Sequence, residues 1–326
     1  MTSILKLPDV WRVIREMDLE SLRRDSEGRF RLVTIADSTP EAEAAAILLS
    51  GDEAGHPWID VWTPADLGPD AEDLGTLTAA LLVTASAALS PPLALAVERL
   101  AEARVPIVTV VYGSMREADG LVRLGEARRV RVQTLDESAI PPVAESLVGA
   151  VPAGVRLALA RQLPPVRPAV FDLLIDETAK ANATYAFTAG MAEAIPILDV
   201  PLNIADTVIL TKNQLLMGYK IALAAGKTGR ARDLIGEVLG VVGGGYLFRQ
   251  AARQLVGLIP LIGIVPKVAI AYTGTWAIGR AVVAWATEGR RLSAAAIGRL
   301  SREAAGRGRS FARGLLGTRR RSAAAK

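Results

Sequence analysis

The stretch TAALLVTASAALSPPLALAVERLAEARVPIVTVVYG, residues 78–113, decides the fold of the first half of the chain. It contains an apolar run, an amphipathic segment that begins at Ser-Pro-Pro, and a second apolar run. This order predicts a strand, a helix and a parallel strand joined by a right-handed crossover. Both apolar runs are continuous, which is typical of strands in a sheet covered on both faces.

The flanking sequence continues the same alternation. Strands are predicted at 29–36 and 57–64, and the segment 40–51 between them is predicted as a helix with Ser38 or Thr39 as its N-cap. On the C-terminal side, we expect a helix at 115–127, a strand at 128–135 and a closing helix at 141–151. Residues 29–152 are therefore predicted to form an α/β domain with a mostly parallel sheet.

No strand pattern continues beyond residue 155, and the rest of the chain is predicted as helices. Residues 153–288 are interpreted as an all-α helical bundle domain, and residues 289–326 as a basic tail that forms one short helix and then frays. Residues 1–28 are interpreted as an N-terminal amphipathic helix. The predicted fold class is thus an α/β domain followed by an all-α domain.

Composition and charge exclude several kinds of site. The chain has no cysteine and one histidine, His56, which excludes thiol catalysis, disulfides and histidine-rich metal sites. A cytoplasmic setting is expected from the missing cysteines. From Glu288 to the end there are eleven Lys/Arg and two Asp/Glu, whereas residues 1–287 contain 27 basic and 32 acidic residues. The basic character therefore belongs to the tail.

The turn that would bind phosphate in a nucleotide-binding domain lacks the residues for it. A phosphate-binding loop needs glycines and a lysine between the first strand and its helix. The turn here is Ala36-Asp37-Ser38-Thr39-Pro40-Glu41, and its two carboxylates would repel phosphate. Residues Tyr112-Gly113-Ser114-Met115 stand where a GTPase reads guanine. The element order is GTPase-like while the nucleotide-contacting residues are missing, so we interpret this part as a degenerate P-loop GTPase-like domain that needs no cofactor.

Several spaced motifs of the second half occur in the order of a known family. They are the segments 164–168, 242–260 and 267–279, with Ile175, Thr178, Asn182, Ile195, Pro196, Asn203 and Asn213. These motifs resemble the GTPase-associated helical domain of unknown function, which is found fused to Era-like and dynamin-like GTPases and in bacterial inner-membrane proteins. The match spans residues 160–288. The resemblance implies a helical companion domain behind a GTPase-like domain, and it implies no catalytic residue.

Polar residues of the second half form a candidate polar face. Asn182 lies on the apolar line of its predicted helix, where its amide is expected to satisfy a buried backbone group or a neighbouring helix. Asp206, Asn213 and Lys220 recur every seven residues and therefore share one helix face. That face is either solvated, a buried polar ladder or a partner site.

The basic tail is a candidate contact for an anionic surface. Only Glu303 opposes its arginines, which are Arg299, Arg302, Arg307, Arg309, Arg313, Arg319, Arg320 and Arg321. Each basic residue near an anionic leaflet contributes about 1 kcal/mol, so several together support reversible attachment. Phe311 and nearby leucines supply apolar side chains for the headgroup region. The alternatives are a disordered solubilising tail and nucleic-acid binding, and the acidic body disfavours nucleic acid.

The function expected from these observations is that of a non-catalytic pseudo-GTPase and helical adaptor. It would bind a protein partner, with a GTPase as one candidate, or an anionic membrane surface from the cytoplasmic side. The alternatives are a GTP-binding protein with an atypical site and an integral inner-membrane protein. The best candidate span, 267–288, contains Arg280, which costs about 2.5–3.5 kcal/mol near the bilayer centre. A soluble or peripheral protein is therefore expected.

Overall fold

The computed structural model describes residues 14–15, 17–67, 74–85, 89–113, 128–192, 202–242, 264–290 and 292–324. Contacts divide the chain into two compact units. One unit is formed by Arg23–Val170, and the other by Met1–Leu22 together with Phe171–Lys326. The first contains every strand of the described residues and the second is helical. The predicted fold class, an α/β domain followed by a helical region, is confirmed.

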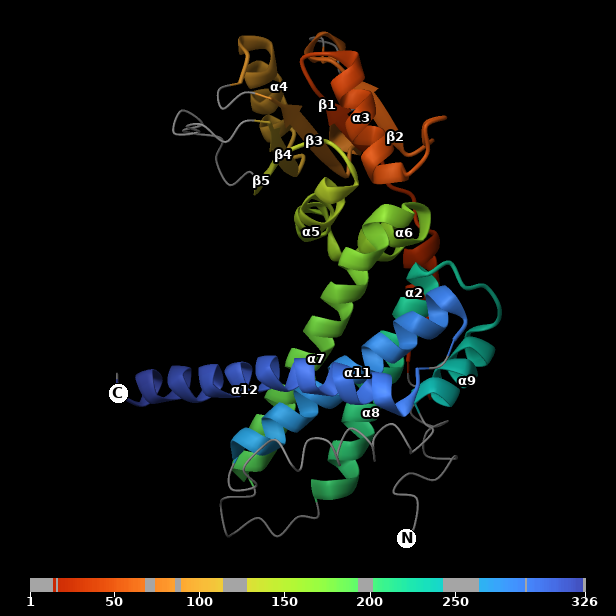
Figure 1. Ribbon diagram of the computed structural model, residues 1–326, viewed down its shortest axis with the longest axis vertical. Helices are drawn as coiled ribbons and strands as arrows, with labels where there is room; N and C mark the ends of the chain where they lie inside the picture. The colour runs from red at the N-terminus through yellow and green to blue at the C-terminus, as the bar shows by residue number, and fades with distance from the viewer. Residues whose placement is uncertain are drawn as a thin grey trace. The chain divides into compact units, whose positions relative to one another are not determined.

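A five-stranded parallel sheet forms the centre of the α/β unit (Figure 1). Its strands are β1 (Leu32–Ile35), β2 (Ile59–Trp62), β3 (Ala79–Thr84), β4 (Ile107–Tyr112) and β5 (Arg128–Val132), in the order β2-β1-β3-β4-β5. In the register, Ile35 of β1 lies beside Trp62 of β2 and Leu82 of β3. The chain proceeds from β1 to one side of the sheet and from β3 to the other, which is the doubly wound arrangement.

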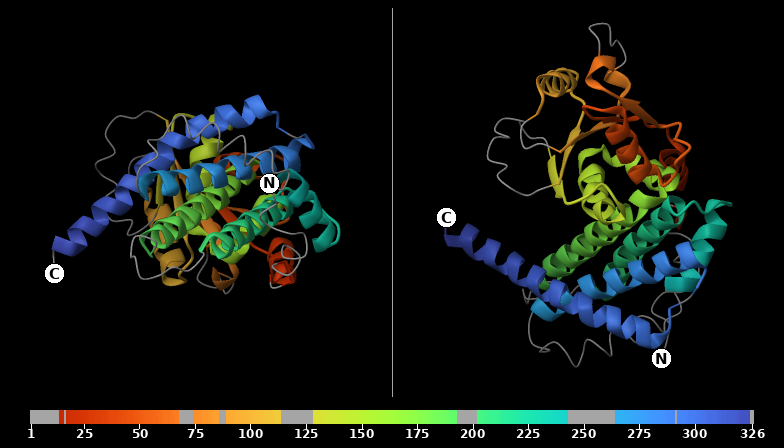
Figure 2. Two further views of the ribbon diagram at one scale, coloured as in Figure 1. Left: turned by 90° about the horizontal axis from the view of Figure 1, so that it is seen from below. Right: turned by 45° about the horizontal axis from the view of Figure 1, so that its top comes forward.

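Three helices cover the two faces of this sheet (Figures 1 and 2). Helix α4 (Pro91–Glu102) lies on one face, where fully buried Leu93 and Leu100 pack against Val33 and Leu82. Helices α3 (Thr39–Ser50) and α5 (Ile140–Ala150) lie on the other face. A fully buried leucine stabilises the fold by about 1.5–3 kcal/mol relative to an exposed one, so these apolar runs hold the sheet in place.

The helices of the unit begin and end where their sequences indicate. At the start of α4, Ser90 is the N-cap and its hydroxyl accepts a hydrogen bond from the backbone N–H of Leu93. At the end of α3, Gly51 takes the left-handed conformation with φ 71°, which costs glycine little because it lacks a Cβ. The predicted helix at 115–127 lies outside the described residues.

Short helical segments connect the strands and longer helices of the α/β unit. They are η1 (Pro64–Asp66), η2 (Leu74–Thr76), η3 (Glu137–Ala139), η4 (Ala153–Val155), α6 (Arg156–Gln162) and η5 (Pro164–Val166), and α2 (Leu19–Glu27) precedes the first strand. Contacts assign residues 153–170 to the α/β unit, whereas the sequence prediction began the helical domain at 153. The physical reason is that Leu159, Leu163 and Val166 are fully buried and η5 packs against α3 and α5.

The helical unit contains α7 (Arg167–Ala192), α8 (Leu202–Ala224), α9 (Ala231–Val242), α11 (Ile264–Glu288) and α12 (Ala294–Ala324). Contacts place α11 against α8, α9 and α12. The core of the helical unit includes fully buried Ile175, Leu215, Ile221 and Val282. Helix α12 runs as one helix almost to the C-terminus, and its last turns extend beyond the other helices of this unit in each view (Figures 1 and 2). The predicted fraying of the tail after a short helix is therefore wrong.

Candidate functional site

The carboxyl edge of the sheet between β1 and β3 is where a doubly wound fold binds ligands. Asp37 follows β1, and Ser90 follows β3 at the start of α4. The Ser90 hydroxyl donates a hydrogen bond to Asp37 Oδ1, and the Ser38 hydroxyl donates to Glu41 Oε2 at 2.9 Å. Tyr112, the last residue of β4, donates from its hydroxyl to Glu41 Oε1. Both carboxylates of this edge therefore have partners within the chain.

This arrangement gives the edge negative charge where a nucleotide site needs the opposite. A helix N-terminus stabilises an anion through its free N–H groups and its dipole. At α3 the anions are the protein's own Asp37 and Glu41, and Pro40 removes one of the N–H donors. The hydrogen bond to Glu41, with burial as a smaller cause, raises the pKa of Tyr112 to about 12. Asp37 and Glu41 are hydrogen-bonded within the chain, and their negative charge disfavours the binding of a phosphate group at this edge.

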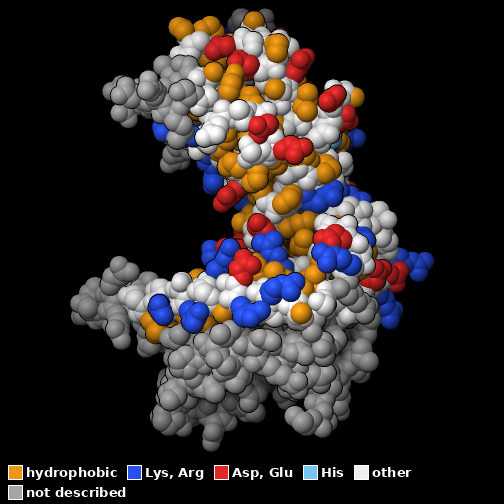
Figure 3. Space-filling model, in the orientation of Figure 1, with side chains coloured by type: hydrophobic (Ala, Val, Ile, Leu, Met, Phe, Trp, Pro, Cys, Tyr) orange, Lys and Arg blue, Asp and Glu red, His pale blue; other side chains and the backbone are white. Residues whose placement is uncertain are grey.

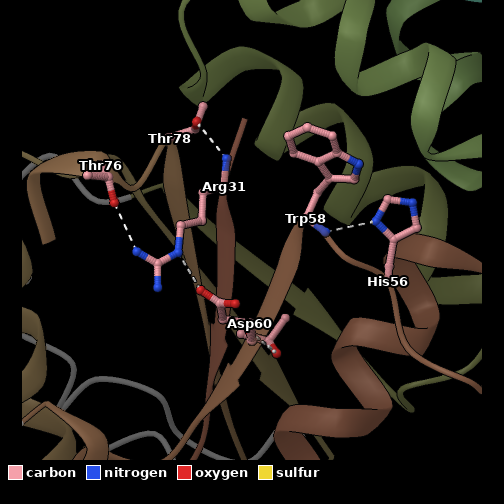
Figure 4. A network of polar contacts seen from close by, with 7 residues as sticks. Arg31, His56, Trp58, Asp60, Thr76 and Thr78 are labelled. Atoms are coloured by element: carbon pink, nitrogen blue, oxygen red, sulfur yellow. Dashed lines mark hydrogen bonds and ion pairs between the residues drawn. The ribbon is translucent and has the colours of Figure 1, made fainter. Parts of the chain in front are cut away.

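A polar network fixes edge strand β2 to β1 (Figure 4). Arg31, just before β1, donates from Nε to Asp60 Oδ2 of β2 at 2.6 Å and from Nη1 to Thr76 Oγ1 at 2.9 Å. Its backbone N–H donates to Thr78 Oγ1 at 3.1 Å, and its guanidinium lies over the Trp62 ring. The network joins the strand to the turn before β3, which is a structural role.

The single histidine belongs to the same region (Figure 4). His56 Nδ1 accepts a hydrogen bond from the backbone N–H of Trp58 at 3.3 Å. Burial lowers the pKa of His56 below its ordinary 6.5, and a hydrogen bond to the backbone of Gln162 opposes that shift. The lowered pKa favours the neutral imidazole, whose Nδ1 accepts the Trp58 hydrogen bond in the loop before β2. Trp58 and Trp62 are both half-buried, and Trp62 belongs to β2 at the edge of the sheet.

In the helical unit, a buried amide and hydroxyl network joins three helices. Asn182 of α7 is fully buried and donates from Nδ2 to Thr275 Oγ1 of α11 at 2.9 Å. Its Oδ1 accepts from Asn213 Nδ2 of α8 at 2.7 Å. Gln214 Nε2 of α8 also donates to Thr275 Oγ1, at 3.2 Å. Asn182 thus satisfies neighbouring helices and is itself satisfied at both ends of its amide.

The other residues of the predicted polar face have different positions. Asn213 is half-buried and belongs to the network, and Lys220 is half-buried two turns further along α8. The hydrogen bonds described for the network do not reach Lys220. Asp206 lies in α8, but its side chain is outside the part of the chain whose side chains the structure describes. The sequence did not assign Gln214 and Thr275 to one network, because only the pairing of α11 with α7 and α8 brings them together.

Helix α12 turns its small and apolar residues toward α11. Its described buried positions are Ile297, Gly298, Ser301, Ala304, Ala305, Gly308 and Ala312. A Cβ added at Gly308 would lie 3.0 Å from the carbonyl oxygen of Ala269, which shows how closely the two helices approach. The Phe311 ring packs on Tyr272 of α11 with centroids 5.8 Å apart. Phe311 was expected to contact lipid headgroups, and it contacts α11 instead.

The opposite side of α12 carries arginines, and basic side chains follow the length of the helix in Figure 3. Arg299, Arg302 and Arg313 are exposed, and Arg309 is half-buried. Their spacing of three, seven and four residues places them along one side of a helix. Arg319, Arg320 and Arg321 continue the helix, but their side chains lie outside the described part of the structure.

Arg307 of α12 contacts α11 through its guanidinium. Its guanidinium lies 5.7 Å from the centroid of the Trp276 ring, and it pairs with Glu303 at 3.9 Å. Arg280 lies over the same ring at 4.8 Å and forms an ion pair with Asp172 of α7 at 2.7 Å. Trp276 therefore accepts two cations, which ties α12 to α11 and α7.

A tyrosine completes the attachment of α11 to α7. The Tyr272 hydroxyl donates to Asp176 Oδ1 at 2.9 Å, and Lys180 pairs with the other oxygen of the same carboxylate at 2.6 Å. Burial is the largest cause that raises the pKa of Tyr272 to about 12, and the Asp176 carboxylate adds to it. Tyr272 therefore remains protonated over the physiological range and keeps its hydrogen bond.

Among the helices that the structure describes, none has both the length and the hydropathy required to cross a bilayer.

No known protein family matches the chain, and neither a curated protein nor a solved structure is significantly similar to it. The resemblance of residues 160–288 to GTPase-associated helical domains stays a prediction from the motifs. The geometry described above is therefore what any proposal of function must rest on.

Proposed function

We propose that this chain acts by binding, as a non-catalytic pseudo-GTPase and helical adaptor, and that it does not turn over nucleotide. The observation that carries this proposal is the carboxyl edge between β1 and β3. There, Asp37 and Glu41 supply the negative charge at the N-terminus of α3, and Ser90 and Tyr112 bind those carboxylates. A triphosphate would have to displace these bonds and approach two like charges.

The partner is proposed to be a protein, with a GTPase as one candidate, or the anionic surface of a membrane on its cytoplasmic side. Support for an anionic partner comes from Arg299, Arg302 and Arg313, which are exposed along one side of α12. The part of the sequence outside the tail has more acidic than basic residues, which disfavours a nucleic acid.

Calorimetric titration with GTP and Mg²⁺ tests the proposal. We expect no binding at micromolar nucleotide, where a Kd of 1 μM corresponds to about −8.2 kcal/mol. The matched variants Asp37→Asn and Glu41→Gln show whether charge is the obstacle, because each removes one carboxylate with almost no change of shape. Micromolar affinity in the unmodified protein, weakened by Ser38→Ala or Thr39→Ala, would overturn the proposal.

A further inference from the structure

We propose that α12 docks flat on an anionic phospholipid surface as a folded helix. In this arrangement, Arg299, Arg302 and Arg313 face the lipid phosphates, and the apolar side of α12 stays on α11. The inference rests on the proposed function and deepens it. It names phospholipid headgroups as the partner and electrostatic docking without insertion as the mode.

The outer side of α12 is positively charged. Arg299, Arg302 and Arg313 lie within 15 residues, and the 14 steps from the first to the last cover about 21 Å of helix at 1.5 Å per residue. Glu303 is the only acidic residue in the sequence of α12, and Arg307 pairs with it. An elongated row of cations, with no second acidic residue in the sequence of α12, complements a flat surface of phosphates, where each cation meets a separate headgroup.

The apolar side of α12 already packs against α11. A helix that inserts into the headgroup region needs a free apolar face. In α12, Ala304 and Ala305 are buried, Gly308 lies against the Ala269 carbonyl, and Phe311 packs on Tyr272. Insertion would break these contacts, whereas docking through the arginine side leaves all of them in place.

The aromatic content of α12 favours a lipid surface over a nucleic acid as the partner of the arginines. Proteins that bind single-stranded nucleic acid combine basic residues with exposed aromatic rings on which bases stack. The single aromatic residue in the sequence of α12 is Phe311, and its ring packs against Tyr272. The row of arginines therefore has no stacking platform beside it on the same helix. Phosphate groups on a lipid surface need none.

Co-sedimentation with vesicles tests the charge requirement. The probes are vesicles of phosphatidylcholine alone and vesicles that contain phosphatidylserine as well. We expect the full chain to sediment with the phosphatidylserine-containing vesicles and to stay in solution with phosphatidylcholine vesicles. Added salt should release the bound protein. The triple variant Arg299→Gln, Arg302→Gln, Arg313→Gln should bind about a hundredfold more weakly.

A matched triple variant controls for net charge. Arg24, Arg29 and Arg131 are exposed and lie outside α12, so their replacement by Gln changes the total charge equally. This control should bind the vesicles as the unmodified protein does. Equal loss in both triple variants, or no loss in either, would overturn the assignment to α12.

The mode of docking is tested with single cysteines, since the chain has none of its own. Ser310 is exposed on the arginine side, and Ser301 is fully buried toward α11. In Ser310→Cys, vesicles should slow the reaction of the thiol with a maleimide. In Ser301→Cys, a nearly isosteric change, the thiol should stay protected with and without vesicles.

Each contrary outcome has a separate meaning. Faster labelling of Ser301→Cys on vesicles would show that α12 leaves α11 and inserts, which contradicts flat docking. Unchanged labelling of Ser310→Cys on bound protein would place another surface at the lipid. Failure of the unmodified chain to sediment with anionic vesicles would overturn the inference as a whole, while the adaptor proposal would still be judged by the GTP titration.

Discussion

Asn182 occupies the place where α7, α8 and α11 meet. Its amide donates to Thr275 and accepts from Asn213, and the side chain is fully buried. Buried amides that are satisfied at both ends fix the relative positions of helices, because any shift leaves a polar atom without a partner. At the scale of single residues, we therefore assign Asn182 to the structure of the helical unit.

Replacement of Asn182 by Leu should lower the free energy of unfolding by about 1–3 kcal/mol, since the amide of Asn213 then loses an acceptor. Urea denaturation of the full chain measures the change. Asn213→Leu is the control and should cost less, because Asn213 is half-buried and water can replace its partner. An Asn182→Leu protein of normal stability that no longer binds anionic vesicles would show a functional role instead.

Tyr112 reports on the closed edge of the sheet through its ionisation. With Glu41 replaced by Gln, the pKa of Tyr112 should fall from about 12 toward its ordinary 10.0, because the neighbouring carboxylate is gone. In the unmodified protein the raised pKa stabilises the folded state below pH 10, and this contribution is lost as pH rises from 10 to about 12. Ultraviolet absorbance during alkaline titration measures the shift, and Tyr112→Phe identifies the signal. An identical titration of the Glu41→Gln and unmodified proteins would contradict the hydrogen bond.

Two glycines of helix α11 differ in how closely a neighbouring helix approaches them. A Cβ added at Gly279 would lie 2.5 Å from Ile175 Cγ1 of α7, whereas one added at Gly274 meets no heavy atom within 4 Å. Both residues lie inside the same helix, so their intrinsic cost to the helix is similar. They differ in packing alone, which makes them a matched pair.

Gly279→Ala should destabilise the protein by about 1 kcal/mol, since the overpacking of buried Ile175 exceeds the gain in helix propensity. Gly274→Ala should stabilise it by about 0.5–1 kcal/mol, because the gain in propensity meets no clash. Thermal unfolding of both variants under one set of conditions measures the difference. Stabilisation by both substitutions would mean that α7 and α11 are not in close contact at Gly279.

The elements also show what the sequence can and cannot predict. The strands and α4 were predicted because continuous apolar runs and a Ser-Pro-Pro start are local signals. The full length of α12 was not, because the helix contains five glycines, each of which costs about 1 kcal/mol in a helix interior. Packing of its small residues against α11 overrides that cost. The network of Asn182, Gln214 and Thr275 was missed in part, since it depends on which helices pair.

At the scale of the whole molecule, charge is divided between the tail and the remainder. Eleven of the 38 basic residues follow Glu288, and the rest of the chain has more acidic than basic residues. The acidic edge of the α/β unit and the arginine side of α12 each agree with this division.

The proposal of binding through α12 without nucleotide turnover is tested by vesicle co-sedimentation with GTP and Mg²⁺ titrated into the same sample. We expect the full chain to sediment with phosphatidylserine-containing vesicles and GTP to leave the bound fraction unchanged, because Asp37 and Glu41 occupy the edge where a nucleotide would bind. A bound fraction that changes with micromolar GTP, or a protein that stays in solution with those vesicles, would contradict the account.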